Sequence, residues 1–269
     1  MIVRLNAGLG NQLFQWAFGR CVSLVRNEEL FFEKYNLNAP GHRAYSLDAF
    51  NLDLKFCEPN GAPLLVETDD RFGFIPEVYA APKGTHYIGN WQTEKYFIEP
   101  LIRRKLMLDK TSFTTDLISK QIRRNTPSAL IHVRRTDYLI PSTAEYHGNV
   151  SLEYYKTAMN IIREVEPHVT FFVFSDDPAW CREAFPGCIV VGHNKPGSGE
   201  SGPGREHEDL YLMSLCDHAI IPNSSFGWWG AWLRPWHNDR SKITIAPKVW
   251  FRKEGLRSED IVPDRWIRL

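Results

Sequence analysis

The chain has 269 residues, of which 43% are hydrophobic and 24% are charged. This composition excludes a disordered chain, and a chain of this length can bury roughly 70–75% of its unfolded surface without disulfides or structural metals. The 32 basic and 32 acidic residues give a formal net charge of zero. Binding to duplex nucleic acid is therefore not expected, because it needs a concentrated cationic face, whereas a local arginine cluster for one phosphorylated ligand stays compatible with this balance.

The five cysteines are odd in number, widely spaced and without a Cys-x-x-Cys pair. They predict reduced thiols in a cytosolic protein. The N-terminus lacks the charged and apolar regions of an export signal, and no stretch approaches the roughly 20 apolar residues of a membrane span. We therefore expect a cytoplasmic protein without a transmembrane segment, and peripheral association with the inner membrane stays open.

The first half predicts a small α/β region. Residues 2–5 predict a strand, 7–10 a glycine turn, and the apolar spacing from Asn11 to near Asn27 a helix. The region 36–83 is rich in Pro, Gly and Asn and has no firm period. Further strands are predicted at 29–33 and 87–91, a helix at 93–108, and a last helical segment ending near Arg124.

The second half alternates short apolar runs with helical patterns, which is typical of a parallel, doubly wound sheet. We expect an α/β fold with two domains, residues 1–125 and 126–269, a loop at 194–205 and a closing segment, 260–269, that packs back on the body of the protein, with the first lobe as one candidate surface. The predicted strands are 129–133, 169–174, 188–191, 218–221 and 242–246, and the predicted helices are 152–164, 178–184, 208–215 and 226–233.

Two consecutive arginines, Arg134 and Arg135, end the predicted strand 129–133 in the stretch from His132 to Asp137. Ligands of doubly wound sheets bind beyond the carboxyl ends of the strands. Guanidinium groups match phosphate oxygens with paired donors and keep their charge near neutrality. Asp137 is either a partner of one arginine or a general base, and a surface Arg–Asp cluster is the alternative for the whole stretch.

Two carboxylates, Asp176 and Asp177, follow the next predicted strand and precede Pro178. Pro178 fits the first position of a helix, and Asp177 fits the N-cap before it. Asp176 then remains at the end of the strand, where a carboxylate can accept hydrogen bonds from a guanine base or a ribose hydroxyl.

Asn223, Ser224 and Ser225 lie between a predicted strand and a predicted helix, where free N–H groups and the helix dipole favour an anion. Plain capping is the alternative for the two serines. The tryptophans that follow at helical spacing, Trp228, Trp229 and Trp232, are interpreted as core anchors.

Near the N-terminus, Gly8 and Gly10 form a glycine turn, but Leu13 stands where a dinucleotide-binding turn needs a third Gly or Ala. Close approach of this backbone to a ligand stays possible, with Asn11 and Gln12 as polar side chains. Metal signals are poor, because the run 206–209 of acidic residues and one histidine begins a helix, where acidic residues are favourable anyway.

Six blocks of residues occur along the chain in this order: GLGNQLFQ at 8–15, WQTEKYF at 91–97, HVRRTDY at 132–138, FSDD at 174–177, NSSFGWWGAWL at 223–233 and IAPKVWF at 245–251. Together they resemble the bacterial α-1,2-fucosyltransferases, glycosyltransferase family 11. The resemblance implies a GT-B architecture of two Rossmann-like lobes facing a cleft. It also implies GDP-β-L-fucose as donor, transfer with inversion to the 2-hydroxyl of a galactose-containing oligosaccharide or glycolipid, and no cofactor or metal.

The resemblance also implies roles for single residues. Arg134 would hold the donor phosphate and support the departure of GDP, with Arg135 beside it. The motifs fix no catalytic base; because inversion places the acceptor hydroxyl opposite the leaving group, a base is expected there, and Asp137 is our candidate. His132 and either Asp176 or Asp177 would contact the guanosine. The remaining candidates are, at the donor, Gly8, Gly10, Asn11, Gln12, Asn223, Ser224, Ser225 and Phe226, and, at the acceptor or between the domains, Trp91, Gln92 and Lys95.

Three alternatives stay open at this point. The same scaffold could transfer fucose to a protein hydroxyl or use a different nucleotide sugar. A sugar- or nucleotide-binding module without turnover would fit the 13% aromatic content, but two adjacent arginines at a strand end are costly for passive sugar binding.

Overall fold

The computed structural model describes residues 1–68, 72–107, 112–192, 194, 198, 201–202, 204–235, 239 and 241–269. The chain forms two compact units. The first comprises Met1–Asp109, Gly197–Gly204 and Gly255–Pro263, and the second comprises Lys110–Pro196, Arg205–Glu254 and Asp264–Leu269. The boundary differs from the expected one at 125/126, because helix α3 (Phe113–Arg124) belongs to the second unit, where Ser112 at its start donates hydrogen bonds to Glu208.

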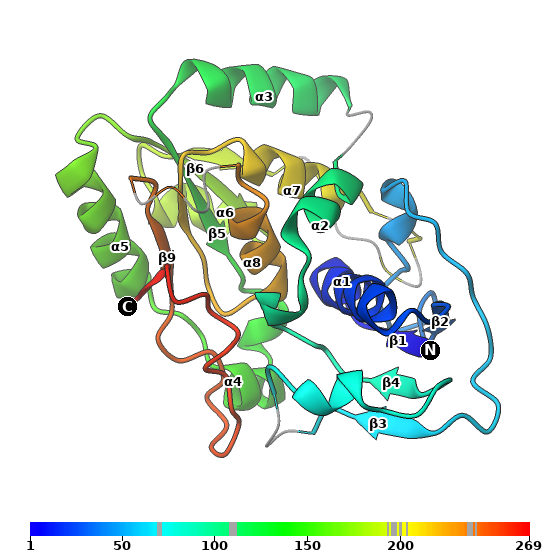
Figure 1. The fold of residues 1–269 in the computed structure, drawn as a ribbon. Helices are drawn as coiled ribbons and strands as arrows, with labels where there is room; N and C mark the ends of the chain where they lie inside the picture. Colours follow the sequence, from blue (N-terminus) through cyan, green and yellow to red (C-terminus); the bar gives the residue numbers. More distant parts are fainter. Residues whose placement is uncertain are drawn as a thin grey trace. The chain divides into compact units, whose positions relative to one another are not determined.

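A parallel four-stranded sheet in the order β2–β1–β4–β3 forms the centre of the first unit (Figure 1). The strand β3 was not predicted, since it lies in the region without periodicity. The strands are β1 (Ile2–Leu5), β2 (Phe31–Lys34), β3 (Leu64–Val66) and β4 (His86–Ile88), the helices are α1 (Leu9–Arg26) and α2 (Glu99–Lys105), and the short 3₁₀ turns are η1 (Leu47–Ala49), η3 (Pro76–Tyr79) and η4 (Glu94–Tyr96).

Helix α1 packs on β1 through an apolar face that includes Leu13, Phe14, Ala17 and Phe18, all fully buried. It begins two residues before the predicted start and ends at Arg26, after which Asn27 caps it in the left-handed conformation. The single helix predicted at 93–108 is instead η4 followed by α2. Pro100 lies in the first turn of α2, where its missing N–H is tolerated, whereas inside one continuous helix it would remove a hydrogen bond.

A parallel six-stranded sheet forms the centre of the second unit, which confirms the predicted parallel α/β fold. Two short elements, α4 and β10, were not predicted. The strands are β5 (Ser128–Val133), β6 (Thr170–Ser175), β7 (Ile189–Val191), β8 (His218–Ile220), β9 (Thr244–Ala246) and β10 (Ile267–Arg268); besides α3, the helices are α4 (Pro141–His147), α5 (Leu152–Val165), α6 (Pro178–Ala184), α7 (Glu206–Ser214) and α8 (Ser225–Trp232), and η5 (Asp137–Leu139) is a 3₁₀ turn.

The strand order β10–β9–β8–β5–β6–β7 is that of a dinucleotide-binding fold. The first two strands of the unit along the chain, β5 and β6, are neighbours, and β8 lies on the other side of β5. The direction of the connections therefore reverses between β5 and β8. A ligand site is expected beyond the carboxyl ends of these strands, because the loops that follow them separate to opposite faces of the sheet.

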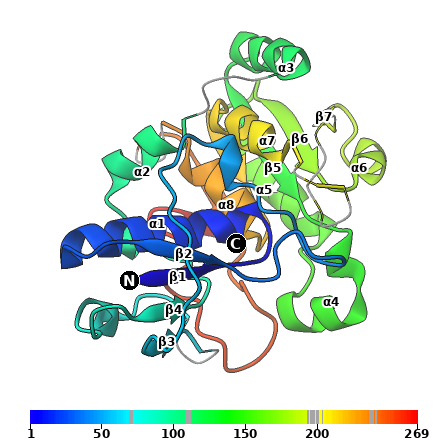
Figure 2. The ribbon, with the colours of Figure 1, turned by 90° about the vertical axis from the view of Figure 1, so that its right-hand side faces the viewer.

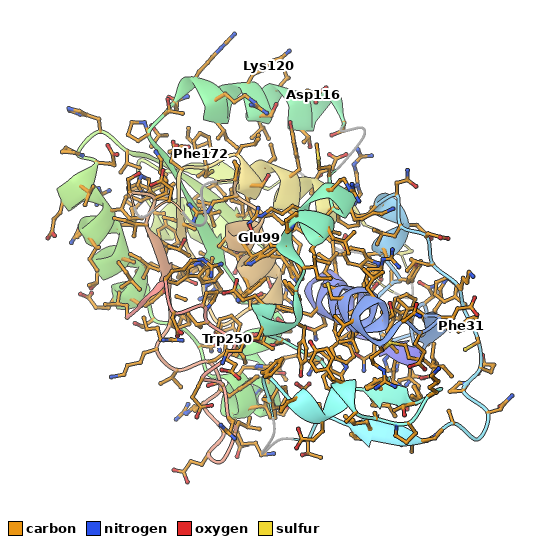
Figure 3. All side chains as sticks on the ribbon, in the orientation of Figure 1. Phe31, Glu99, Asp116, Lys120, Phe172 and Trp250 are labelled. Carbon is orange, nitrogen blue, oxygen red and sulfur yellow. The ribbon has the colours of Figure 1, made fainter. Side chains whose placement is uncertain are left out.

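Helices cover both faces of this sheet. Alternate residues of β5 and β6 pack with α5 and α6 in one apolar cluster that contains Ile131, Val173, Tyr155 and Cys181. The intervening side chains point to the opposite face and are also buried, as Phe172 is (Figure 3). Figure 2 shows α6 and α7 on opposite sides of β6. Burial on both faces explains why the strands read as continuous apolar runs.

The closing segment contributes to both units. Gly255–Pro263 clusters with the first unit, where Asp260 accepts a hydrogen bond from the Phe74 amide at 3.0 Å and forms an ion pair with Lys95. Residues 264–269 belong to the second unit, and the Trp266 ring lies 5.5 Å from that of Trp228. All five cysteines are free thiols. Among the described residues, no helix is long and apolar enough to cross a membrane.

Candidate functional site

The three predicted segments of the second unit follow β5, β6 and β8 and meet at the carboxyl edge of the six-stranded sheet. The end of β5 and the segment after it touch the segment after β8 at two places. The His132 ring lies 5.5 Å from that of Phe226, and the Tyr138 hydroxyl donates to the Asn223 carbonyl at 2.8 Å. The carboxyl ends of β5 and β8 therefore carry a single cluster of residues at the expected ligand edge.

Arg134 is held between two carboxylates. Its Nη2 donates to Asp137 at 2.5 Å, and its Nη1 lies 3.2 Å from Asp176. Burial acts to lower the pKa of Arg134, but Asp176 and Asp137 outweigh it and hold this pKa above its ordinary value. The guanidinium is therefore a fixed positive charge of defined orientation, which is what an anionic ligand requires.

Asp176 accepts hydrogen bonds from the backbone after β5. Its donors are the amides of Arg135 at 2.9 Å and Thr136 at 3.2 Å, together with the Thr136 hydroxyl at 2.6 Å. Burial acts to raise the pKa of Asp176, but Arg134 and these hydrogen bonds hold it below its ordinary value. Asp176 is therefore an ionised carboxylate that shapes the β5 loop.

Arg135 points to a different neighbour than Arg134 does. Its guanidinium lies 4.0 Å from the centre of the Trp180 ring, and its Nε donates to Asp177 at 3.2 Å. Asp177 also accepts from the Trp180 amide at 3.2 Å, which confirms its predicted place as the N-cap of α6. Arg135 and Asp177 thus fasten the start of α6 to the end of β5.

His132 is buried under the first turn of α8. A Cβ on Gly227 would overlap Nδ1 of His132, so only glycine permits this close approach. Burial lowers the pKa of His132 to about 3, against an opposing effect of Asp176, so the ring is neutral near pH 7. Among the described residues its Nδ1 has no hydrogen-bond partner. This nitrogen is buried against the backbone of Gly227 at the carboxyl end of β5.

Asn223 joins three segments through one amide. Its Nδ2 donates to the carbonyls of His147 at 2.7 Å and Trp250 at 2.9 Å. Sequence reasoning missed His147, whose ring stacks on that of Tyr138 at 5.0 Å between centroids. Buried atoms without a partner in the described chain gather here: Oδ1 of Asp137, Oδ1 of Asn223 and Nδ1 of His147. No sequence signal marks His147, because its contacts with Asn223 and Phe251 join segments far apart along the chain.

Ser224 and Ser225 stand at the start of α8, as predicted. Ser224 is the N-cap residue, but its side chain makes no capping hydrogen bond, and the first turn of α8 contains no acidic residue. Plain capping, the alternative interpretation of Ser224, is therefore wrong. Because no capping side chain accepts from the first turn of α8, its backbone N–H groups can donate to an anionic ligand.

The glycine turn of the first unit lies at the carboxyl end of β1. Gly8 caps α1, and Gly10 and the half-buried Asn11 lie in its first turn. Gln12 was expected to face a ligand, yet it is fully buried, with its amide nitrogen donating to Ala7 and Ala44 carbonyls and its oxygen accepting from the Ser46 amide. The amide of Gln12 is fully hydrogen-bonded within the protein, so Gln12 stabilises the turn and does not face a ligand.

The candidates at 91–95 differ in accessibility. Trp91 is fully buried and stacks on Phe18, with ring centroids 4.2 Å apart. Gln92 is largely buried and donates to Asn11 at 3.0 Å, while Lys95 pairs with Asp260. The Trp91 ring therefore belongs to the core of the first unit. Gln92 is the residue of this set that lies beside the glycine turn.

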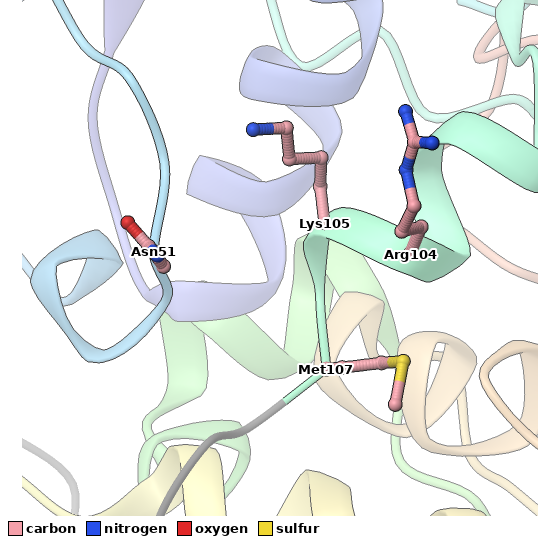
Figure 4. A pocket seen from close by; sticks show the side chains of 4 residues that line it. All are labelled: Asn51, Arg104, Lys105 and Met107. Carbon is pink, nitrogen blue, oxygen red and sulfur yellow. The ribbon is translucent and has the colours of Figure 1, made fainter.

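A cavity of about 340 Å³ in the first unit is lined by Asn51, Arg104, Lys105 and Met107 (Figure 4). None of the predicted site residues lines it. Within the described parts of the chain, no group of three His, Cys, Asp or Glu side chains is arranged to hold a metal ion.

The order of the six-stranded sheet and the arginine at its switch point define the second unit as a nucleotide-binding type of α/β fold. Residues 75–269 match the model of glycosyl transferase family 11. The chain therefore belongs to glycosyl transferase family 11.

Curated relatives are similar over different shares of the chain. An α-1,2-colitosyltransferase of Escherichia coli is 34% identical, with 100% of this chain and 98% of the relative covered. The O-antigen biosynthesis glycosyltransferase WbnK of the same species is 27% identical over 98% of this chain and 99% of its own length. The mouse galactoside 2-α-L-fucosyltransferase Sec1 is 28% identical over 61% of this chain and 45% of its own.

Solved structures share the fold at low identity. The α-1,6-fucosyltransferase NodZ, in crystals soaked with GDP-fucose, aligns with a TM-score of 0.53 at 17% identity over 87% of this chain and 92% of NodZ. Arabidopsis thaliana FUT1 in complex with GDP aligns with a TM-score of 0.51 at 11% identity over 97% of this chain and 74% of its own. This likeness establishes the fold alone.

Proposed function

We propose that the protein transfers L-fucose, with inversion and without a metal, from GDP-β-L-fucose to the 2-hydroxyl of a galactoside. The main support is the position of the Arg134 guanidinium. Asp176 and Asp137 fix it at the carboxyl edge of the six-stranded sheet, where the strand order reverses. The mouse relative's name supports the fucosyl group and the galactoside, and the Escherichia coli relative's name supports the 1,2 linkage. A cytoplasmic location and the facing lobes of a GT-B enzyme belong to the same proposal.

The reaction forms a bond between the acceptor oxygen and the anomeric carbon and breaks the bond from that carbon to the diphosphate oxygen. GDP leaves with one additional negative charge. Arg134 and the amides at the start of α8 supply positive character for this charge, and each charge-assisted hydrogen bond contributes roughly 1.5–3 kcal/mol. Such donors must be in place before the bond breaks, which is the role of Asp176 in orienting Arg134.

The nucleoside is assigned to the neighbouring side chains. His132 is neutral and has a buried nitrogen without a partner in the described chain, which suits a hydrogen bond to an uncharged part of guanosine. Asn223, Ser224, Ser225 and Phe226 would border the diphosphate. Since Asp176 and Asp177 are engaged with the β5 loop and α6, either would contact guanosine while keeping those bonds.

The proton of the acceptor hydroxyl is assigned to Asp137. One of its oxygens binds Arg134, and the other is buried without a partner among the described residues. The second oxygen can accept a proton once a hydroxyl replaces the missing partner. Arg134 would then link the base to the leaving group through a single guanidinium.

A second donor, GDP-colitose, is favoured by one observation, the 34% identity to the α-1,2-colitosyltransferase over the whole chain. Colitose is L-fucose without its 3-hydroxyl, so both sugars present the same leaving group. A site that hydrogen-bonds the 3-hydroxyl would reject the deoxy sugar strongly, whereas an apolar site would discriminate little.

The test is a product-linkage assay with both donors and a panel of β-galactosides. A new α-1,2 linkage from GDP-fucose supports the proposal, and a higher kcat/KM with GDP-colitose assigns the second donor. Hydrolysis or transfer from UDP-sugars, or binding of galactosides without any affinity for GDP, would overturn it. The Arg134→Ala variant serves as the comparison with lowered turnover.

A further inference from the structure

A buried carboxylate, Glu67, directly follows β3 in the first unit. Its Oε2 accepts hydrogen bonds from the amides of Asn90 at 2.6 Å and Trp91 at 3.0 Å, and its Oε1 accepts from the Gly73 amide at 3.4 Å. Only 9% of the residue is exposed. Carboxylates are rarely buried to this extent, and within the described residues Glu67 accepts from backbone amides on two separate segments.

The turn that Glu67 binds is strained. Trp91 has a φ of +54°, a left-handed conformation for a bulky residue, which costs roughly 1–3 kcal/mol unless the surroundings impose it. A Cβ on Gly89 would lie 2.6 Å from Cβ of Glu67, so the approach of β3 to this turn requires glycine. Glu67 and the Phe18 ring stacked on Trp91 together impose the conformation.

The strained turn directs Gln92 toward the glycine turn after β1. Because β1 and β4 are parallel neighbours, both turns lie at the carboxyl edge of the four-stranded sheet. Gln92 donates to Asn11 at 3.0 Å, while its Oε1 is buried and has no partner in the described chain. Such an acceptor suits a sugar hydroxyl, which can donate to it and accept from a neighbouring amide.

We propose that Glu67 is a positioning residue that holds the turn 89–92 so that Gln92 and Asn11 form a subsite for the hydroxyl groups of the acceptor sugar. Asn11, which the resemblance assigned to the donor, is thereby assigned to the acceptor. This inference rests on the proposed function. Glu67 itself touches no substrate. It acts through the backbone amides of Asn90 and Trp91.

The protonation state of Glu67 offers a readout that a merely structural residue would lack. Burial raises the pKa of Glu67 to about 7, although the three amide donors act to lower it. Among the residues that the structure describes, the other titratable groups on this side are Tyr96, whose hydroxyl donates to the Gly73 carbonyl, and the Asp260–Lys95 pair beyond Gly73. A carboxylate accepts all three bonds better than a carboxylic acid does, so the turn loosens as pH falls through about 7.

The experiment compares Glu67→Gln, Glu67→Asp and the matched control Glu58→Gln, which makes the same change on an exposed side chain of the first unit. In Glu67→Gln, one carboxylate oxygen becomes an NH₂ group that faces an amide donor. We expect the KM for the galactoside to rise by about tenfold or more, while the affinity for GDP stays unchanged. Glu67→Asp keeps the charge and should recover part of the loss.

In the wild type, the galactoside KM should rise as pH falls from 8 to 6, and in Glu67→Gln this dependence should be absent. An unchanged galactoside KM in a Glu67→Gln variant that is merely less stable would overturn the inference. If the wild type transfers no sugar, the proposed function fails. Amide hydrogen exchange in wild type and Glu67→Gln then tests whether Glu67 positions the turn. Faster exchange at the amides of 90 and 91, with unchanged β5 amides, supports positioning, and equal exchange refutes it.

Discussion

The Asp176 carboxylate lies 3.2 Å from Nη1 of Arg134 and joins the ends of two neighbouring strands, β6 and β5. Only 18% of the Arg134 side chain is accessible, as expected of a group held in one orientation. Two carboxylates on one guanidinium leave it less attractive to an anion in solution but fix its direction. Preorganised charge of this kind stabilises a developing anion without reorganisation during the reaction.

Replacing Arg134 with alanine should lower turnover about 100–1000-fold, the usual cost of losing one preorganised donor. Arg134→Lys keeps the charge and loses the paired donors, so its turnover should lie between those of the wild type and Arg134→Ala. Steady-state kinetics with GDP-fucose and GDP-colitose measure this, with Arg163→Ala on α5 as the control for loss of an arginine away from the site. Turnover within about threefold of the wild type would remove Arg134 from the mechanism.

Asp137→Asn separates a base from an ion-pair partner. A general base contributes roughly 100–10,000-fold to the rate, and the asparagine retains the size of the side chain and an acceptor for Arg134. We expect kcat to fall by at least about 100-fold while GDP affinity changes little. The measurement is kcat together with calorimetric titration of GDP. A folded Asp137→Asn protein with most of its turnover would show that the residue only pairs with Arg134.

Gly227→Ala tests the contact between α8 and His132. The added Cβ overlaps the buried His132 ring, so the first turn of α8 must shift, at a cost of about 1–3 kcal/mol in stability. GDP affinity should fall with it. Gly230→Ala is the matched control on the same helix, because its Cβ makes a similar overlap with the buried Met213 side chain and not with His132. Equal GDP affinity in both variants would contradict the proposed role of this turn.

Much of the second unit was predictable, because its strands are buried on both faces and read as apolar runs, and because α5 buries one apolar face. The Asp177–Pro178 pair fixes the start of α6 at the predicted residue, since both signals act locally. By contrast, α4 has no fully buried residue and therefore no strong apolar pattern. The two-residue strand β10 depends on pairing with β9, which no local signal reports.

The site was predictable in its residue types and less so in their partners. The sequence predicted Arg134 and Asp176 at the same edge of the sheet, because the carboxyl ends of parallel strands lie on one side. Gln12 and Gln92 carry the same amide group. Only the folded chain shows that the amide of Gln12 donates to the Ala44 carbonyl and accepts from the Ser46 amide. The roles of Glu67 and His147 depend on contacts between segments distant in the sequence, which periodicity does not encode.

One structural carboxylate, Glu208 of α7, ties α3 to the second unit. It accepts from the Ser112 amide at 3.0 Å and the Ser112 hydroxyl at 2.7 Å, and also from the Thr115 hydroxyl and Arg205. Only 1% of the residue is exposed. Burial acts to raise the pKa of Glu208, but these hydrogen bonds outweigh it and lower the pKa to about 2.

The stability that Glu208 contributes should depend on pH in a defined window. Its folded-state pKa lies below the ordinary value of 4.5, so the contribution is complete above pH 4.5 and is lost as pH falls toward 2. Each pKa unit corresponds to about 1.4 kcal/mol, which gives roughly 3 kcal/mol at pH 7. Urea unfolding of wild type and Glu208→Gln from pH 3 to 7 measures the difference, with the exposed Glu153→Gln as control. The difference should be constant above pH 5 and shrink below it; a gap that persists unchanged at pH 3 would mean that packing and not charge fastens α3.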